Sequence, residues 1–339
     1  MTMPLKISVD AMGGDHGPST VVPAVVESLR AHQDTHFILC GNKELILAEG
    51  VNQLESSLRA RIEIHHTLSA VGGDDKPSSV IRSKMDSSMA MAIQAIANNE
   101  ADVCVSAGNT GALMALGLFQ LGVLPGISRP AICSTIPTKK GSCLVLDLGA
   151  NTDCSAEQLA QFALLGSLSA ECLFGSKSPT IKLLNIGTES IKGNLVIQEC
   201  ADLIQSRSEL NYQGFIEGSG LFAGEADVVV CDGFSGNIAL KASEGTAKLI
   251  GHRFAHFLKQ DWRTKLAGLI LGKRLSQLEL SLQPEFYNGA LLMGLNGVVV
   301  KSHGGADMLG FKAAINTAIE SAQHQLPSEL SSKLNQLTN

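Results

Sequence analysis

The chain has 339 residues, of which 45% are hydrophobic and 17% are charged, and its formal net charge at pH 7 is −6. A chain of this length and composition buries a sizeable core, which excludes a disordered or fibrous protein. The balance of 26 basic against 32 acidic residues argues against general nucleic-acid binding, so we expect no nucleic-acid partner.

Short β-branched runs alternate along the chain with longer segments of helical periodicity. The predicted strands cover residues 5–10, 36–40, 62–65, 102–106, 131–136, 142–147, 180–186, 227–232 and 297–301. The predicted helices cover residues 20–32, 87–98, 111–121, 156–173, 236–258 and 305–324. This alternation predicts an α/β fold, a three-layer α/β/α Rossmann-like arrangement around a mostly parallel sheet.

The domain organisation is predicted to be simple. No linker, low-complexity tract or internal repeat divides the sequence, so residues 1–339 are expected to form a single domain. Residues 264–282 do not lead into a strand, which predicts a helical arm at about 255–285. The uncharged stretch 103–128 is long enough to suggest a membrane span, but its internal Gly, Asn and Pro residues favour a strand, a turn and a helix.

The cysteines and the amino-terminal residues bear on the cellular compartment. The eight cysteines form no C-x-x-C pair and no disulfide-framework spacing, which is typical of a reducing environment. The first residues, MTMPLKISVD, lead directly into a strand pattern without a signal peptide. We therefore expect a cytoplasmic protein.

Five predicted strands end in loops rich in Gly, Asp and Asn, at residues 10–18, 106–112, 146–153, 185–194 and 232–237. Glycine lets backbone N–H groups approach a tetrahedral anion, and the start of a following helix adds a partial positive charge. One such loop is more typical of an ordinary turn or helix cap. Because the carboxyl ends of parallel strands meet at one edge of a sheet, all five loops are expected to line one anion-binding crevice.

Common cofactor and nucleophile motifs do not occur in the sequence. It contains no G-x-x-x-x-G-K-[ST], and residues 218–224 have one residue too many for G-x-G-x-x-G. Residues 233–236 lack the spacing of a G-x-S-x-G elbow, so we expect neither a nucleotide cofactor nor a side-chain nucleophile.

Metal binding receives little support. His252 and His256 stand four residues apart, but no carboxylate or cysteine group lies close in sequence to complete a site. The strand-end aspartates, among them Asp10 and Asp147, are as typical of helix caps as of magnesium ligands. We therefore assign no metal-binding residues from the sequence.

The segment 262–275 carries a charge of +4 with no acidic residue. Its charges flank an apolar run that includes Leu269 and Ile270. The charged residues are Arg263, Lys265, Lys273 and Arg274. One interpretation is contact with a membrane surface or with an acidic, lipid-carrying partner, and the other is a helix–helix dimer interface.

An ordered set of motifs carries a resemblance to a known family. The motifs are DAMGGDHGP (10–18), KPSSVIRSKMDSSM (76–89), SAGNTGA (106–112), LDLGAN (146–151), NIGTESIKGN (185–194), DGFSGN (232–237) and YNGALLMGLNG with the following HG (287–297, 303–304). Together they resemble the bacterial phosphate acyltransferase (PlsX) family over residues 5 to about 320. The chain departs from the family pattern at Asn288, where a second Gly is usual, and at Gly305-Ala306, where small hydroxyl residues are common.

The resemblance implies a fold similar to those of phosphotransacetylases and isopropylmalate dehydrogenases, and a homodimer. It implies transfer of a long-chain fatty acyl group from acyl carrier protein to inorganic phosphate, without a cofactor. The acyl phosphate would serve a membrane glycerol-3-phosphate acyltransferase in phospholipid synthesis, which places the protein in the cytoplasm with peripheral membrane association. Phosphate as both bound anion and nucleophile agrees with anion loops that lack a nucleophilic side chain.

On this hypothesis, Asn109, Thr110 and the backbone of Gly111 hold phosphate, while Lys192 offsets its repulsion from carboxylates. Asn237 and Ser235 are candidates to hold the thioester oxyanion. His303 either protonates the leaving thiolate, orients phosphate or caps the last glycine loop. The other residues predicted to bind phosphate or substrate are Asp10, Gly13, Gly14, Asp15, Asn151, Glu189 and Asp232.

Two other function classes are compatible with parts of the sequence. A decarboxylating dehydrogenase of the related fold requires a nicotinamide site and an arginine cluster, for which Arg82 and Arg129 are poor candidates. A non-catalytic scaffold for acyl carrier protein and a membrane partner requires only the basic segment, and it leaves the five loops unexplained.

Overall fold

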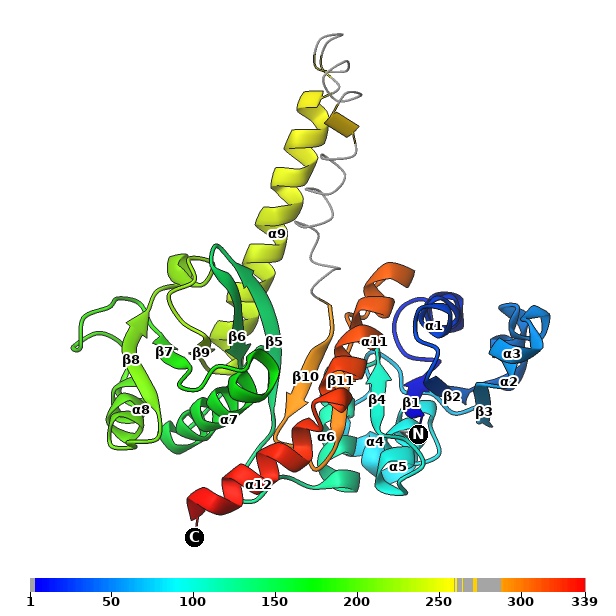
Figure 1. Ribbon diagram of the computed structural model, residues 1–339, viewed down its shortest axis with the longest axis horizontal. Coiled ribbons are helices and arrows are strands. Elements are labelled where there is room, and N and C mark those ends of the chain that lie inside the picture. Colours follow the sequence, from blue (N-terminus) through cyan, green and yellow to red (C-terminus); the bar gives the residue numbers. More distant parts are fainter. Residues whose placement is uncertain (1–3, 259, 261–263, 265–270, 273–287, 339) are drawn as a thin grey trace.

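The computed structural model describes residues 4–258, 260, 264, 271–272 and 288–338 (Figure 1). Its strands are β1 (Leu5–Asp10), β2 (Thr35–Gly41), β3 (Ile62–His66), β4 (Val103–Ser106), β5 (Ala131–Thr138), β6 (Gly141–Leu146), β7 (Thr180–Leu184), β8 (Asn211–Ile216), β9 (Val228–Val230), β10 (Ala290–Met293) and β11 (Val298–Lys301). Its helices include α1 (Pro18–Ala31), α2 (Lys43–Ala48), α3 (Ser56–Arg59), α4 (Pro77–Ser83), α5 (Ser88–Ala97), α6 (Thr110–Leu121), α7 (Ala156–Phe174), α8 (Leu195–Gln205), α9 (Gly233–Leu258), α11 (Met308–Gln323) and α12 (Leu326–Thr338).

The described strands form one sheet in the order β3-β2-β1-β4-β11-β10-β5-β6-β9-β7-β8. Alternate residues of the strands face different apolar clusters. On β4, Val103 and Val105 pack in the cluster with α1, α7 and α11, whereas Cys104 packs with α5 and α6. Burial on both faces explains the continuous apolar runs of the strands. The predicted α/β fold with a mostly parallel sheet is confirmed.

The direction of the strands changes across the sheet. The pairs β10–β11, β10–β5 and β5–β6 are antiparallel, and the other pairs are parallel. The strands β1, β4 and β11 therefore run opposite to β6, β9 and β7. The expectation that all five loops share one edge is wrong, because the loops 10–18 and 106–112 lie at one edge and the other three lie at the opposite edge.

The edge strand β8 and the central strand β10 are missing from the predicted elements. Most of β8 remains partly exposed, since an edge strand pairs on one side and its sequence NYQGFI needs little apolar character. The four-residue β10 is too short to show a period. It runs antiparallel to both β5 and β11, so those two strands share one direction, and the antiparallel pair β5–β6 completes the reversal of the sheet.

The uncharged stretch 103–128 contains β4 and the twelve-residue helix α6, as the sequence favours. None of the helices in the described part of the chain is long and apolar enough to cross a membrane.

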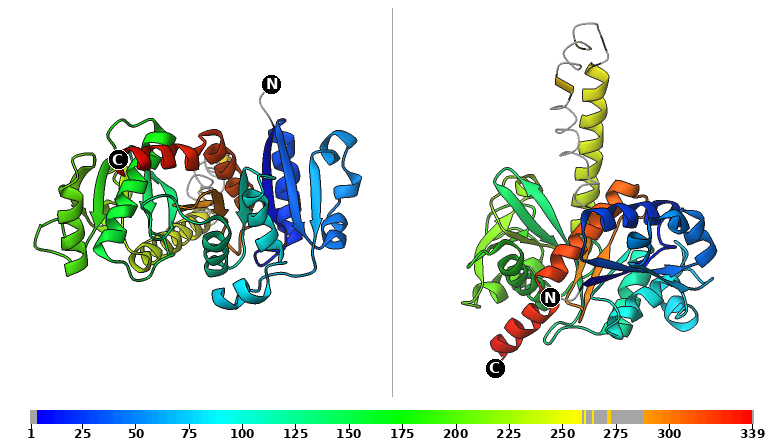
Figure 2. Two further views of the ribbon diagram at one scale, coloured as in Figure 1. Left: turned by 90° about the horizontal axis from the view of Figure 1, so that it is seen from below. Right: turned by 45° about the vertical axis from the view of Figure 1, so that its right-hand side comes forward.

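Helix α9 projects from the body of the molecule in both views that show it upright (Figures 1 and 2). Its first turn is anchored tightly, because a Cβ on Gly236 would lie 2.0 Å from the main-chain oxygen of Asp147. Beyond Gly236 no residue of α9 is fully buried. Residues 255–258 of the predicted arm belong to this helix, but Arg263, Lys265, Leu269, Ile270, Lys273 and Arg274 lie outside the described residues.

Candidate active site

Three loops at the carboxyl ends of β1, β4 and β11 pack directly against one another. Gly14 has a φ of +83°, and a Cβ there would lie 2.9 Å from both the Gly304 oxygen and the Ala107 Cβ. The Asp15 N–H donates to the same Gly304 oxygen at 2.9 Å. A Cβ on the neighbouring Gly13 would lie 2.5 Å from Oδ2 of Asp10. Gly13 and Gly14 of the DAMGGDHGP motif are thus required for this close packing, which extends to Gly108 of the loop after β4.

The Asp10 carboxylate is buried beneath these loops. Its oxygens accept hydrogen bonds from Ser88 Oγ at 2.6 Å and Ser106 Oγ at 2.7 Å. Burial raises the pKa of Asp10, and the hydrogen bonds from the two serines offset part of this rise. Asp10 therefore joins the ends of β1 and β4 to the start of α5. Its carboxylate is bound to these buried serines.

A cavity of about 950 Å³ lies between these loops, β5 and α9. Of the predicted site residues, it brings together Thr110, Asn237 and His303. Thr110 and His303 come from the loops after β4 and β11, whereas Asn237 comes from the opposite edge of the sheet on the second turn of α9. The cavity thus joins the two edges that the reversal of strand direction separates.

Lys301 also lines this cavity and is absent from the residues predicted from the sequence. It is the last residue of β11, and its Nζ donates to the Ala107 oxygen at 3.2 Å and to the main-chain oxygen of Ser302. Burial lowers the pKa of Lys301 to about 8, against the opposing effect of Asp10. The available sequence signal was a lysine at the carboxyl end of the apolar run VVV, directly before Ser302-His303-Gly304.

The His303 ring has a defined hydrogen-bonding pattern. The Gly305 N–H donates to its Nδ1 at 3.1 Å. Burial lowers the pKa of His303, and the nearby Lys241 lowers it further, so the ring is neutral at pH 7. Because Nδ1 accepts a hydrogen bond, the remaining ring proton is assigned to Nε2. His303 can therefore donate a hydrogen bond from Nε2, although it carries no charge.

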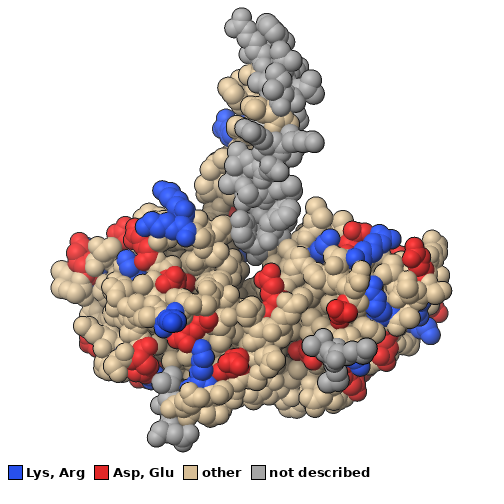
Figure 3. Space-filling model, viewed as in Figure 1, with Lys and Arg blue, Asp and Glu red and all other residues tan. Residues whose placement is uncertain are grey.

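Two lysines of α9, Lys241 and Lys248, line the cavity together with Lys301. Lys241 is paired with Glu244 at 2.9 Å. On the outer face drawn in Figure 3, by contrast, basic and acidic side chains are interspersed. Three lysines against one glutamate give the cavity an excess of positive charge, which suits an anionic ligand.

The predicted phosphate loop is held by Asn109. Its Oδ1 accepts the Ala112 N–H at 2.9 Å, which caps α6, and its Nδ2 donates to the Gly73 oxygen at 2.6 Å. A Cβ on Gly111 would lie 2.9 Å from Cγ of Pro77. Asn109 and Gly111 thus fix the start of α6 against residues 73–77, and Thr110 is the member of the predicted phosphate set that lines the cavity.

The side chains of three more predicted residues, Asn151, Asp232 and Ser235, make hydrogen bonds away from the cavity. Asn151 is buried, and its Nδ2 donates to Asp147 Oδ2 and to the Pro130 oxygen, both at 2.9 Å. Asp232 accepts from the Ser235 N–H at 2.8 Å and from Ser235 Oγ at 2.9 Å, so this pair caps the start of α9. None of these three side chains is among those that line the cavity.

Glu189 and Lys192 lie on the exposed loop between β7 and α8. The Lys192 N–H donates to the Glu189 main-chain oxygen at 3.0 Å. Neither residue lines the cavity. The structure therefore does not bring Lys192 together with Thr110 and His303.

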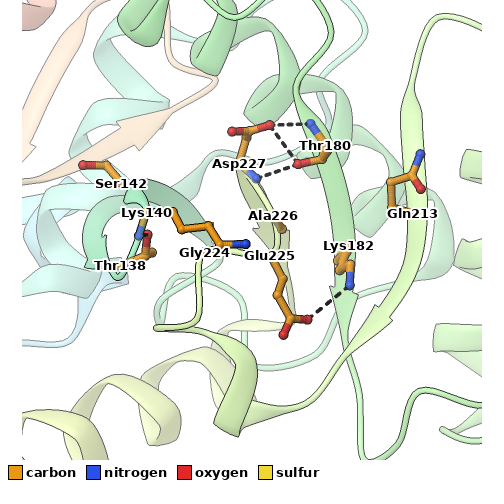
Figure 4. A pocket seen from close by; sticks show the side chains of 10 residues that line it. All are labelled: Thr138, Lys140, Ser142, Thr180, Lys182, Gln213, Gly224, Glu225, Ala226 and Asp227. Carbon is orange, nitrogen blue, oxygen red and sulfur yellow. Dashed lines mark hydrogen bonds and ion pairs between the residues drawn. The ribbon is translucent and has the colours of Figure 1, made fainter.

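A second hollow of about 540 Å³ lies at the amino ends of β6, β9 and β7 (Figure 4). Asp227 there accepts hydrogen bonds from the Thr180 N–H at 2.7 Å and its hydroxyl at 2.8 Å. Lys182 pairs with Glu225 at 3.5 Å. These polar groups satisfy one another, so the larger cavity is the better candidate active site.

Comparisons with known proteins show the family to which the chain belongs. Residues 5–329 match the model of a family described as fatty acid synthesis protein. The phosphate acyltransferase of Halorhodospira halophila is 46% identical over 99% of this chain and 98% of its own length. That of Pseudomonas syringae pv. syringae is 48% identical over 98% of this chain and 97% of its own length. The chain belongs to the phosphate acyltransferase family.

This membership confirms the predicted family and the predicted enzyme class, and it decides against the dehydrogenase and scaffold alternatives. Among solved structures, a phosphotransacetylase from Streptococcus pyogenes matches with a TM-score of 0.62 and 16% identity, covering 94% of each chain. A branched-chain phosphotransacylase from Enterococcus faecalis matches with a TM-score of 0.61 and 15% identity, covering 94% of this chain and 99% of its own. At this identity the likeness shows a shared fold.

Asn288, one of the two departures from the phosphate acyltransferase pattern, has a visible structural role. Its Nδ2 donates to Ser302 Oγ at 2.8 Å and to the Gly310 oxygen at 2.9 Å, and its Oδ1 accepts the His303 N–H at 2.9 Å. The side chain therefore holds the Ser302 hydroxyl and the His303 main-chain N–H at the same time. In this acyltransferase Asn288 orients the loop that carries His303.

Proposed function

We propose that this enzyme transfers a long-chain fatty acyl group from acyl carrier protein to inorganic phosphate and releases an acyl phosphate. The observation that carries the proposal is the convergence of Thr110, Asn237 and His303 on one cavity with an excess of positive charge. The acyl phosphate then serves phospholipid synthesis through a membrane glycerol-3-phosphate acyltransferase.

The described lining of the cavity favours phosphate itself as the nucleophile. It contains no cysteine. Its buried serine, Ser302, has no paired base, because its oxygen accepts from Asn288 and the nearby His303 Nδ1 already accepts the Gly305 N–H. An activated serine needs such a base within hydrogen-bond reach. A phosphate oxygen would therefore attack the thioester carbonyl directly.

The reaction forms one bond and breaks one. A phosphate oxygen adds to the carbonyl carbon, the carbonyl oxygen becomes an oxyanion, and the carbon–sulfur bond then breaks with its electron pair leaving on the thiolate. Asn237 and the Nε2–H of His303 are the proposed donors to the oxyanion. Thiols have a pKa of about 8.5, so the thiolate leaves without a general acid. Because His303 is neutral, orientation or oxyanion binding fits it better than proton donation.

The apolar part of the same cavity is the proposed site of the acyl chain. Its walls include Ile132 and Ile136 of β5, Leu240 of α9, and Phe222. A fatty acyl chain is the portion of the substrate that gains most from such an environment, at about 0.8 kcal/mol for each buried methylene group.

The proposed partners extend beyond the cavity. We propose a homodimer, cytoplasmic with peripheral membrane association, that contacts acyl carrier protein or membrane through Arg263, Lys265, Leu269, Ile270, Lys273 and Arg274. A further apolar surface supports such contacts, because Phe234, Ile238 and Phe257 of α9 are each more than half exposed. Light scattering of the protein and its sedimentation with anionic vesicles test these two parts separately.

The central experiment mixes the purified protein with palmitoyl acyl carrier protein and inorganic phosphate. Hydroxylamine traps acyl phosphate, and released carrier thiol is counted in parallel. Phosphate-dependent thiol release with an equal yield of hydroxamate is the expected result. Thiol release without hydroxamate would mean hydrolysis, and no release would reject the proposed reaction.

The proposed role of Lys192 needs its own test, since this residue does not line the cavity. If Lys192 offsets the charge of phosphate, Lys192→Ala abolishes turnover while its circular dichroism spectrum and melting temperature stay unchanged. An unchanged kcat/KM would remove Lys192 from the site. Lys177→Ala, another loop lysine of the same half of the sheet, is a control for general loss of surface charge.

A further inference from the structure

Lys301 stands directly beside the strand that leads to the predicted phosphate loop. It is paired with Ser106 in the parallel register of β11 and β4. Four residues after Ser106, Thr110 begins α6 and lines the same cavity. Neighbouring strands lie about 4.8 Å apart, so the end of β11 lies directly beside the loop that leads from β4 to Thr110.

The ammonium group of Lys301 is a largely desolvated charge that has no carboxylate in ion-pair contact within the described residues, although Asp10 and Asp15 act on it from farther away. Its hydrogen bonds in the structure go to the neutral main-chain oxygens of Ala107 and Ser302. No ion pair of Lys301 occurs within the described residues, and the buried carboxylate of Asp10 is bound to serine hydroxyls. An ammonium group has three N–H donors, so one is left for the cavity. A desolvated cation that has no anion in direct contact is costly, and a bound anion removes this cost.

The start of α6 offers further donors for the same anion. The N–H of Ala112 bonds to Asn109 Oδ1, and that of Leu113 bonds to the Asn109 main-chain oxygen. The first N–H groups of a helix have no partner within the helix, and here those of Thr110 and Gly111 precede the capped ones. Thr110 adds a hydroxyl group at the same place.

The loops leave space for an anion to approach these donors. Close packing of Gly14 against Gly304 puts backbone rather than side chains at the back of the site. The adjacent Gly304 and Gly305 line the cavity beside His303. A phosphate group can therefore reach main-chain N–H groups, a hydroxyl and an ammonium group from one side.

We propose that Lys301 and the Thr110 end of α6 form the binding site of the acceptor phosphate, with Lys301 as the catalytic cation that contacts it. This inference rests on the proposed acyl transfer and adds to it the position of the nucleophile. Lys301 draws the dianion into the cavity and offsets its repulsion from the electron-rich thioester oxygen. One phosphate oxygen stays free to attack the carbonyl carbon, and no proton has to move to Lys301.

Binding of inorganic phosphate tests the site without any acyl substrate. We expect 20 mM phosphate, compared with chloride at equal ionic strength, to raise the melting temperature of the wild-type protein and to leave that of Lys301→Met unchanged, because a ligand stabilises only a fold that binds it. The control is Lys182→Met, which removes a partly buried strand lysine that is paired with Glu225 outside the cavity. It should keep the full phosphate effect.

Steady-state kinetics provide the second readout. In Lys301→Met the KM for phosphate should rise at least about tenfold, whereas the Kd for palmitoyl acyl carrier protein should change less than twofold. Lys301→Arg keeps the charge, so its KM for phosphate should lie between that of the wild type and that of Lys301→Met. A phosphate-induced rise in melting temperature that persists in Lys301→Met, or that is missing from the wild type, would overturn the inference. Phosphate binding without acyl transfer would instead reject the proposed reaction and leave the anion site in place.

Discussion

Lys301 Nζ donates to the main-chain oxygen of Ala107 at 3.2 Å, and this hydrogen bond joins the end of β11 to the loop after β4. The two residues are 194 positions apart in the sequence. Their contact brings the only strand-end lysine of the cavity lining next to the start of α6. Four experiments follow from this arrangement and from the loops around it.

The activity should depend on the protonation of Lys301. Its pKa is lowered to about 8 by burial, so the ammonium form that attracts phosphate is lost as the pH rises through about 8. We expect kcat/KM for phosphate to fall about tenfold for each pH unit above that value, as for a single ionisation. Asp10 and Asp15 raise this pKa and Lys241 lowers it, so Lys241→Met should move the alkaline limb upward. A profile that stays flat to pH 9.5 would contradict this assignment.

Lys301 should also destabilise the folded protein at neutral pH. Its pKa in the folded state, about 8, lies below the ordinary value of 10.5, which corresponds to a penalty of about 3 kcal/mol for holding the charge. Between these two pH values the unfolded chain binds more protons, so wild-type stability rises with pH. Lys301→Met has no ionisable group at this position, so its stability does not show this rise with pH.

Urea unfolding at several pH values measures the difference. At pH 7 the Lys301→Met variant is expected to be more stable than the wild type, although it has lost phosphate binding. The advantage should shrink as the pH rises from 8 to 10.5. A variant that is less stable than the wild type at every pH would show that the two hydrogen bonds of Lys301 outweigh the cost of its burial.

His303 should act as a neutral hydrogen-bond donor. Its Nδ1 accepts from Gly305, and burial lowers its pKa, so the proton on Nε2 is the group available to substrate. His303→Ala should lower kcat by about 10², the usual effect of removing one oxyanion donor. His303→Gln can still donate from its amide and should recover part of the loss. Equal losses in both variants, with a strong solvent isotope effect, would indicate proton transfer instead.

The packing of Gly14 can be tested against another glycine of the same chain. Gly14→Ala places a Cβ 2.9 Å from the Gly304 oxygen at a φ of +83°, and we expect it to destabilise the protein by about 1–3 kcal/mol. Gly245 lies within α9 with nothing within 4 Å of a Cβ, so Gly245→Ala should stabilise by up to about 1 kcal/mol. Urea unfolding of the two variants compares them directly, and equal effects would contradict the loop packing.

The α/β alternation and the glycine loops could be recognised from the sequence because they depend on local patterns. Apolar runs such as VVV before Lys301 have the period of buried strands, and Gly-Asn-Thr before α6 has the chemistry of a helix cap. The glycine-loop pattern together with the family resemblance pointed to Thr110, Asn237 and His303, which line the cavity.

Only the tertiary structure could decide which polar side chains face the cavity. Asp10 and Asn151 occupy loops that look like ligand loops, yet both are turned inward by partners distant in sequence, Ser88 for Asp10 and Pro130 for Asn151. Three antiparallel pairs, β10–β11, β10–β5 and β5–β6, reverse the sheet, so loops that share a local pattern lie at opposite edges. Lys301 lies beside the loop after β4 because β11 pairs with β4. The direction of a short polar side chain depends on which residues pack against it. Those residues come from distant parts of the sequence, so only the paired and packed strands determine them.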